Sequence, residues 1–487
     1  MPAQAGGVVG ASRARVTTPS ASHPPLLEKE GSQARGIVMF GKVVVANRGA
    51  VAARVLRALA EMGIRSVAVY SEADAGAPYL EMASEAHAIG PAPARASYLD
   101  QNILIEVLRK SHADGLHPGY GFLSENAAFA QRVTEAGARF IGPSPRWIEA
   151  MGHKTRAREL AASHGMPMSK GSGVLPADKE ATLAAARAIG FPVLIKPAGG
   201  GGGIGMLPAK DEGELIAAVE RSRSMADRGF GNAEVYLERL IERPRHVEFQ
   251  VLGDAHGNAA HLFERDCSTQ RRNQKVIEEA PAPGLARATV GTLAERIAQI
   301  MRRLGYDNIG TVEMLMGADG SFSFLEMNTR LQVEHGVTEE VTGVDLVKAQ
   351  IRSAAGERLP SILPEPIEVK GHAIEARVYA EDPRNFFPSP GKLKVFRPPR
   401  DPRVRVETGY AEGRDVTPHY DPMIAKVIVR AETRERAVDG LIEALTAFEI
   451  EGIKHNIPAV LAVLRSEPFR AGRVHTGLIA EVLAVRK

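Results

Sequence analysis

Five consecutive glycines, Gly199 to Gly203, follow a short apolar segment that ends in Lys196. A second apolar segment begins at Ile204. Glycine costs backbone entropy on folding and packs no side chain, so a structural loop rarely needs such a run. Bare backbone N–H groups can instead close over a polyphosphate, with Lys196 neutralising charge beside it. The run lacks the GK[ST] ending of a Walker A loop, and a flexible linker is the competing interpretation.

Two carboxylates can be placed opposite each other from the sequence. Apolar segments 310–316 and 322–328 flank Asp319-Gly320, a preferred two-residue hairpin turn. With that turn, Glu313 lies directly opposite Glu326, so the two repel unless a cation lies between them. Oxygen ligands favour Mg²⁺ or Mn²⁺, and Mg²⁺ commonly joins carboxylates to nucleotide phosphates. The alternative is a pair of solvated carboxylates, and without metal we expect the fold to be more stable when both are removed.

Beyond Glu326, polar residues alternate with mostly apolar ones as far as His335. Strict alternation puts the polar residues on one face of an extended segment, which would separate Glu326 from Glu334 by ~26 Å. The chain must therefore bend, or the face must serve two ends of a large site. We expect Arg330, Gln332 and Glu334 to form an anion subsite with its own base, distinct from the metal end. A plain exposed strand is the alternative.

Four cations lie within the segment 264–275, which ends in Lys275. Such clusters are usually solvated surface charge. Beside a phosphate loop and a metal pair, a strip that binds phosphate or carbonate is the stronger hypothesis. No aromatic residue interleaves the cluster, which argues against RNA binding.

The composition limits what kind of protein can carry these residues. A chain of 487 residues with 44% apolar content is typical of about three ordinary domains. Lys plus Arg exceed Asp plus Glu by only 61 to 58, and aromatic residues make up 5%, so a dedicated nucleic-acid binder is not expected. No uncharged apolar stretch approaches the ~18 residues of a membrane span. The single cysteine, Cys267, rules out an internal disulfide and fits a reducing compartment, so we expect a cytoplasmic protein.

The patterns along the chain predict alternating strands and helices. A strand at 42–46, an amphipathic helix at 51–62 and a strand at 66–70 form an α/β unit. The turn at 47–50 lacks GxGxxG, so a nicotinamide-dependent dehydrogenase is not expected. A second amphipathic helix is predicted at 289–304, and strands followed by helices are predicted from Gly371 onward.

Residues 1–40 have a different composition. They are rich in Ala, Ser, Gly and Pro, show no hydrophobic period, and predict a disordered extension. An organellar transit peptide is the alternative, and Met39 is a possible start of the ordered protein.

Together these segments resemble the biotin carboxylases, which are ATP-grasp enzymes of acetyl-CoA, acyl-CoA and pyruvate carboxylases. The motifs that carry the resemblance are VVANRG (44–49), HPGYGFLSEN (117–126), the glycine run, ERDCS (264–268), EMNTRLQVEH (326–335) and the strand with Arg377. The resemblance implies an α/β ATP-grasp fold with a Rossmann-like N-terminal domain at 41–153, an ATP-grasp domain at 154–365 with a lid at about 168–240, and a C-terminal domain at 369–482.

The resemblance also implies an activity. ATP, bicarbonate and biotin on a carrier protein would give ADP, phosphate and carboxybiotin, as the first half-reaction of an acetyl-CoA or acyl-CoA carboxylase in fatty acid biosynthesis. A separate biotin carboxyl carrier protein and a carboxyltransferase subunit are implied as partners, together with a homodimer. Another ATP-grasp ligase that activates bicarbonate, such as a carbamoyl-phosphate-type enzyme, is the alternative.

The roles of single residues follow from the same resemblance. Glu334 would deprotonate bicarbonate, and Arg377 would stabilise the biotin enolate. Bicarbonate would be bound by Lys275, Arg330, Gln332 and the Val333 amide. Magnesium or manganese would be held by Glu313, Glu326 and Asn328. ATP would be held by Lys154, Lys196, Gly200, Gly201, Gly202, Gly203, Glu238, His246 and Gln270.

Five positions depart from the family's common pattern. They are Ala50 for an acidic residue, Ile204 for an arginine, Arg239 for a lysine, Asn273 for a histidine and Gly336 for a proline. None of these changes removes a predicted catalytic group, but Ile204 and Asn273 would alter the nucleotide contacts.

Overall fold

The computed structural model describes residues 39–199 and 204–485. Gly200 to Gly203, predicted to bind phosphate, lie outside the described residues, as does most of the predicted extension. Met39 and Phe40 are described, and Phe40 is buried over Gly115, where a Cβ would come within 2.8 Å of its ring. Phe40, which the sequence analysis assigned to the extension, is therefore packed against the edge of the first sheet.

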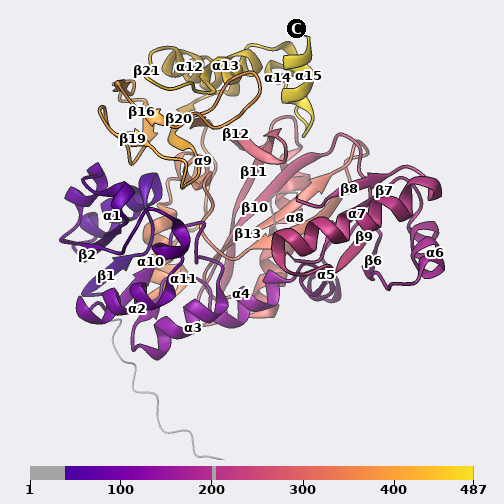
Figure 1. Ribbon diagram of the computed structural model, residues 1–487, viewed down its shortest axis with the longest axis horizontal. Coiled ribbons are helices and arrows are strands. Elements are labelled where there is room, and N and C mark those ends of the chain that lie inside the picture. Colours follow the sequence, from indigo (N-terminus) through magenta and orange to yellow (C-terminus); the bar gives the residue numbers. More distant parts are fainter. Residues whose placement is uncertain (1–38, 200–203, 486–487) are drawn as a thin grey trace, which may run out of the picture. The chain divides into compact units, whose positions relative to one another are not determined.

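The N-terminal part is a parallel sheet with helices around it, which confirms the predicted α/β unit (Figure 1). The strand order is β3-β2-β1-β4-β5, with all neighbours parallel. The strands are β1 (Lys42–Val45), β2 (Arg65–Tyr70), β3 (Glu85–Ala88), β4 (Gly115–His117) and β5 (Arg139–Phe140). The helices are α1 (Gly49–Glu61), α2 (Gln101–Lys110), α3 (Ala127–Glu135) and α4 (Pro145–Gly152). Residues 47–49 leave the carboxyl end of β1, where polar groups of α/β folds gather.

A four-stranded antiparallel sheet carries the glycine run. Its order is β6-β9-β7-β8, made of β6 (Gly171–Val174), β7 (Val193–Pro197), β8 (Leu207–Ala209) and β9 (Val235–Arg239). As predicted, strands flank the run, and β7 pairs with β8 so that Ile195 lies opposite Leu207. Helices α6 (Lys179–Ile189) and α7 (Glu212–Phe230) bury apolar faces against this sheet.

The largest sheet has eight strands in the order β14-β13-β10-β11-β12-β15-β20-β18, with antiparallel neighbours throughout. Its strands are β10 (Arg245–Gly253), β11 (Ala259–Arg271), β12 (Gln274–Ala280), β13 (Ile309–Met316), β14 (Phe322–Asn328), β15 (His372–Tyr379), β18 (Val404–Glu407) and β20 (Met423–Ala431). The predicted helix at 289–304 is α8 (Arg287–Leu304), which packs on β10 and β11. Because β12 pairs with β15, one sheet joins the predicted ATP-grasp and C-terminal regions.

Four further helices are short. They are α5 (Lys154–Ser163), α9 (His335–Thr342), α10 (Leu346–Ala354) and α11 (Leu359–Ile362). Helix α9 lies against β11, β12, β15 and β20. It therefore ties the segment that ends in Glu334 to the middle of the eight-stranded sheet.

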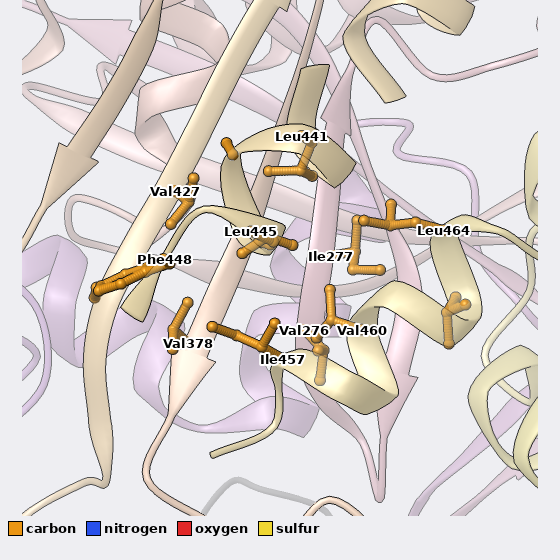
Figure 2. Packing of buried hydrophobic residues seen from close by; sticks show 14 of the residues in the cluster. Val276, Ile277, Val378, Val427, Leu441, Leu445, Phe448, Ile457, Val460 and Leu464 are labelled. Carbon is orange, nitrogen blue, oxygen red and sulfur yellow. The ribbon is translucent and has the colours of Figure 1, made fainter. Parts of the chain in front are cut away.

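The C-terminal core lies on the β15–β20 part of that sheet. Figure 2 shows Val378 of β15 and Val427 of β20 packed with Leu441, Leu445 and other apolar side chains. The covering elements are α12 (Arg434–Thr446), α13 (Ile457–Leu464), α14 (Glu467–Arg470), α15 (Leu478–Ala484) and two small strand pairs, β16–β19 (Gly391–Lys392, Asp415–Val416) and β17–β21 (Val395–Arg397, Glu449–Glu451). This core holds β15, the strand that carries Arg377, in place.

The β13–β14 hairpin confirms the predicted carboxylate pair through a different turn. Glu313 does lie directly opposite Glu326. The turn, however, is a three-residue loop closed by Gly317 and Ser321, whose N–H and C=O groups bond at 2.9 Å, with Gly320 at φ +79°. A β-bulge between Glu313 and Met314 takes up the extra residue. The bulge therefore restores the predicted pairing beyond it.

None of the helices among residues 39–199 and 204–485 is long and apolar enough to cross a membrane.

Candidate active site

A cavity of about 750 Å³ gathers side chains from the four-stranded and eight-stranded sheets and from residues that follow β1 and β4. Apolar residues such as Leu194, Met206 and Leu315 line one part of it. Most of the predicted site residues line the rest: Lys154, Lys196, Glu238, His246, Gln270, Lys275, Glu313, Glu326, Asn328, Arg330, Gln332, Val333 and Arg377. Predicted residues from separate parts of the chain thus share one site.

Lys275 is the centre of the charged cluster in this cavity. Its Nζ lies 2.5 Å from Glu248, 2.8 Å from Glu313 and 2.7 Å from Glu334. Burial alone would lower the pKa of Lys275, but these three carboxylates hold that pKa well above its ordinary value. The ammonium group is therefore a permanent cation.

Glu334 lies directly behind the cavity wall, at the N-terminus of α9. Its side chain is fully buried and contacts Lys275 at 2.7 Å and Arg377 at 2.9 Å. Burial opposes ionisation, but the charges of Lys275, Arg377 and then Arg265 outweigh it and hold the pKa of Glu334 well below its ordinary value. Glu334 is thus an ionised carboxylate covered by two cations that themselves line the cavity.

Arg377 divides its guanidinium between two carboxylates. Its Nη2 donates to Glu334 at 2.9 Å and its Nε donates to Glu278 at 2.6 Å. Burial raises the pKa of Glu278 to about 8, although Arg377 works in the opposite direction. The cross-strand partner of Glu278 is Glu375, so two buried carboxyl groups face each other behind the arginine.

The segment after β14 bends instead of continuing as a strand. Residues 329–334 form a loop before α9, and Gln332 Nε2 donates to Glu313 at 3.1 Å. Arg330 donates to Glu125, to Asn328 at 2.8 Å and to Gln332 at 3.0 Å. The chain therefore bends, which is one of the two arrangements that the sequence allowed. Gln332 contacts Glu313, and Lys275 contacts both Glu313 and Glu334, so the predicted metal end and the predicted anion end adjoin each other.

The predicted metal ligands carry cations and donors as their neighbours. Lys154 lies 3.0 Å from Glu326, His246 lies 3.0 Å from Glu313, and Asn328 Nδ2 donates to Glu313 at 2.8 Å. Burial is outweighed by Lys275 and His246, so the pKa of Glu313 is well below its ordinary value. Two carboxylates and an amide oxygen are the hard donors that Mg²⁺ or Mn²⁺ prefers, so the residues fit such an ion.

The predicted nucleotide-binding residues form two further contacts. Lys196 lies 3.0 Å from Glu238, a buried carboxylate that also pairs with Arg158. Gln270 Nε2 lies 2.7 Å from His246 Nδ1. If Nδ1 accepts that bond, the ring hydrogen is on Nε2, which lies 3.0 Å from Glu313 but forms no hydrogen bond to it. These contacts hold a lysine and a histidine at the cavity wall.

The run of four cations at 264–275 does not form one strip. Arg265 is fully buried, and its guanidinium is bonded to Glu248, Gln250, Thr311 and Thr338. Arg271 pairs with Glu381. Arg272 is exposed, and of the four only Lys275 lines the cavity. The strands β11 and β12 alternate their faces, which sends neighbouring cations in different directions.

Three supporting residues escaped the sequence analysis. Glu248 pairs with Lys275, Glu278 with Arg377, and Lys426 donates to the carbonyl of Val333 at 2.5 Å. The alternation of His246, Glu248 and Gln250 on one strand was an available signal for Glu248. Lys426 had none, because its partner lies 93 residues away in the sequence.

Three family models match the chain. Residues 39–148 match the N-terminal domain of biotin carboxylase, residues 153–362 the ATP-binding domain of the carbamoyl-phosphate synthase L chain, and residues 375–481 the C-terminal domain of biotin carboxylase. The three matches follow one another along nearly the whole described chain.

Similar proteins and structures agree with these matches. A biotin carboxylase of Halalkalibacterium halodurans is 47% identical over 92% of this chain and 99% of its own length. The mitochondrial alpha subunit of methylcrotonoyl-CoA carboxylase from Rattus norvegicus is 46% identical over 90% of this chain and 62% of its own. The biotin carboxylase domain dimer of 2-oxoglutarate carboxylase from Hydrogenobacter thermophilus, solved with MgADP, ADP and bicarbonate, has a TM-score of 0.88 and 43% identity over 92% of this chain and 99% of that one.

Proposed function

The chain belongs to the biotin carboxylase family, and from that premise we propose that its cavity carboxylates biotin on a carrier protein with ATP and bicarbonate, through carboxyphosphate. The observation that carries this proposal is the contact of Glu334 with both Lys275 and Arg377. A carboxylate held ionised between two cations that line a cavity provides a base next to an anion site.

The residues around this contact bind bicarbonate and remove its proton. Bicarbonate binds to Lys275, Arg330, Gln332 and the Val333 amide, and its charge draws the two covering cations away from Glu334. Glu334 then accepts the bicarbonate proton, and the resulting oxygen attacks the γ-phosphate of ATP. The bond from the γ-phosphorus to the bridging oxygen breaks, so ADP leaves and carboxyphosphate forms. Lys426 supports this step because its ammonium group donates a hydrogen bond to the Val333 carbonyl and so orients the Val333 backbone.

The second chemical step takes place at Arg377. Its guanidinium lines the cavity and is oriented by Glu278. In this position it stabilises the negative charge that develops on the biotin ureido oxygen when biotin is deprotonated. The group is a permanent cation, because its pKa stays well above the ordinary value despite burial, owing mainly to Glu278.

The divalent cation would be held by Glu313, Glu326 and Asn328. The nucleotide would be surrounded by Lys154, Lys196, Glu238, His246 and Gln270. When bound, Mg²⁺ or Mn²⁺ supplies charge neutralisation between carboxylates and phosphates. Lys154 and Lys275, which contact Glu326 and Glu313 in the structure, would then be freer to bind the substrates.

The partners follow from the same reaction. A biotin carboxyl carrier protein must deliver biotin, and a carboxyltransferase subunit must consume carboxybiotin. The relatives serve different carboxylases, including methylcrotonoyl-CoA and 2-oxoglutarate carboxylases, so the final acceptor and a role in fatty acid biosynthesis remain predictions. A homodimer is supported by the dimeric domain from Hydrogenobacter thermophilus. A cytoplasmic location is supported by the free, buried thiol of Cys267.

Acceptor dependence tests the proposal. Phosphate release by the purified chain with MgATP and bicarbonate should rise when free biotin is added, with carboxybiotin formed. Release that responds to ammonia and not to biotin would instead favour a carbamoyl-phosphate-type ligase and would contradict the proposal.

A further inference from the structure

We propose that the loop 382–388 and the β11–β12 turn form a docking surface, here called the carrier platform, for an acidic face of the biotinylated carrier. This inference rests on the proposed function, because it assigns the place where the carrier lies while its biotin enters the cavity. The platform consists of Phe387, Arg384, Asn385 and Arg272.

Phe387 is the most exposed aromatic side chain of the described residues, with 63% of its surface accessible. A single exposed apolar residue is ordinary on a protein surface. Phe387 differs because its loop is held in place: Asp382 and Phe387 are bonded through their backbones at 2.9 Å, and the Phe387 N–H donates to Asn385 at 3.0 Å. A rigid aromatic ring loses little entropy on binding, which is why such rings anchor interfaces.

The base of the loop is equally fixed. Asp382 accepts from the N–H groups of Arg384 and Asn385 and pairs with Lys454 at 2.6 Å. Phe386 lies under the guanidinium of Arg271, 4.9 Å from ring centroid to carbon. One phenylalanine is thus turned inward and the next outward by a loop with several hydrogen bonds.

Both segments of the platform contain residues with left-handed backbone angles, which supports a binding role for them. Phe386 has φ +60°, Arg272 φ +50° and Asn273 φ +65°. A bulky residue in this region is strained, and such strain clusters at functional sites. The two strained segments touch, since Arg272 Nη2 lies 3.4 Å from the Asn385 carbonyl.

The charge of the platform selects the partner. Among the described residues, no carboxylate lies within ion-pair distance of Arg272 or Arg384, whereas Lys454 is neutralised by Asp382. Two exposed unpaired cations beside an exposed ring favour a protein face with carboxylates around an apolar residue.

The position of the platform matches the path of biotin. Asn273 and Gln274, the residues after Arg272, line the cavity, and Tyr379, just before the loop, lines it too. Arg271 connects the two parts by donating to Gln274 at 2.9 Å and to Glu381 at 2.6 Å. A carrier seated on the platform would therefore sit at the rim of the cavity that holds Arg377.

The experiment compares two biotin acceptors. Free biotin and a biotinylated carrier domain, chosen from a panel of carboxylase carriers as the one that the parent chain carboxylates best, are assayed with F387A, R384E and the double variant. Controls are M82A, an exposed apolar residue on another surface, and R303E, an exposed arginine at the end of α8. Light scattering reports the oligomeric mass of each variant.

We expect kcat/KM for the carrier to fall by about tenfold or more in each platform variant, the scale of a lost anchor residue, and the salt dependence to weaken in R384E. Free biotin kinetics and the two controls should stay unchanged. Equal loss with both acceptors, no loss with the carrier, or a change in oligomeric mass would each overturn the platform. If the parent carboxylates neither acceptor, the proposed function itself fails, which is a different result from these.

Discussion

Arg377 donates a hydrogen bond to Glu334, with 2.9 Å between Nη2 and Oε2. The group assigned to the biotin oxyanion and the group assigned to bicarbonate thus touch before any substrate is bound. The two chemical steps are therefore neighbours in space, and each residue influences the charge of the other.

The first prediction separates these steps. R377Q should reduce carboxybiotin formation by ~10²–10³, the cost of one oxyanion donor, while bicarbonate-dependent phosphate release without biotin falls much less. Because Arg377 helps to keep the pKa of Glu334 low, the acid limb of phosphate release should shift to higher pH in the variant. Both products are measured in the same reaction. Equal loss of both would place Arg377 in the phosphoryl step.

A second prediction concerns the metal ligands. E313Q and E326Q should each raise the Mg²⁺ concentration needed for half-maximal ATP turnover by about tenfold, equivalent to about 1.4 kcal/mol of binding. E340Q, at a glutamate of α9 that pairs with Arg405 outside the cavity, is the control. Unchanged magnesium dependence in both variants would show that the site lies elsewhere.

The contacts of Glu313 and Glu326 change the stability effect expected from the sequence. Opposed like charges suggested that a metal-free chain would gain stability without them. Glu313 instead contacts Lys275 and His246, and Glu326 contacts Lys154. We now expect E313Q to lower the free energy of unfolding by about 1–3 kcal/mol, the range for a hydrogen bond to a charged group. Urea unfolding without metal measures it, and a more stable E313Q would contradict the pairing.

A third prediction uses the buried carboxyl pair on β12 and β15. Burial raises the pKa of Glu375 to about 7 and that of Glu278 to about 8, whereas an unfolded glutamate titrates near about 4.3. Between these values the folded chain binds more protons than the unfolded chain, so stability falls as pH rises. E375Q cannot ionise and should lose less stability between about pH 5 and about pH 8. Urea unfolding across this range measures the slope, and parallel slopes would refute the assignment.

A fourth prediction concerns residues 1–38 and Phe40. A variant that begins at Met39 should keep its melting temperature and ATP turnover, because the sequence before it has no apolar period with which to dock. F40A should lose about 3 kcal/mol, at the low end for a buried phenylalanine. Loss of stability on removal of residues 1–38, or none in F40A, would move this boundary.

The hairpin shows how far local patterns reach. The predicted two-residue turn gave the correct pairing of Glu313 with Glu326, because a β-bulge offsets the extra residue of the observed turn. The three-residue turn and its compensating bulge were not predictable, since the two-residue alternative has equally good residues.

Longer-range features of the site were beyond such reasoning. The alternation from Glu326 to His335 is typical of an extended segment with one polar face. The chain instead leaves β14 after Asn328 and enters α9 at His335, and α9 packs on β11, β12, β15 and β20. Glu278 and Lys426 meet their partners through strand pairings that connect distant segments. The residue types could be recognised, but their contacts depend on tertiary structure.

The central claim is that Glu334 activates bicarbonate for transfer to biotin, and radiolabelled bicarbonate tests it most directly. The parent should incorporate label into biotin with one phosphate released for each carboxybiotin, and E334Q should lose both signals together by ~10²–10⁴, the contribution of a positioned general base. E340Q, at a glutamate of α9 six residues after Glu334, should behave like the parent. If E334Q still forms labelled carboxybiotin at a rate close to that of the parent, the account is contradicted.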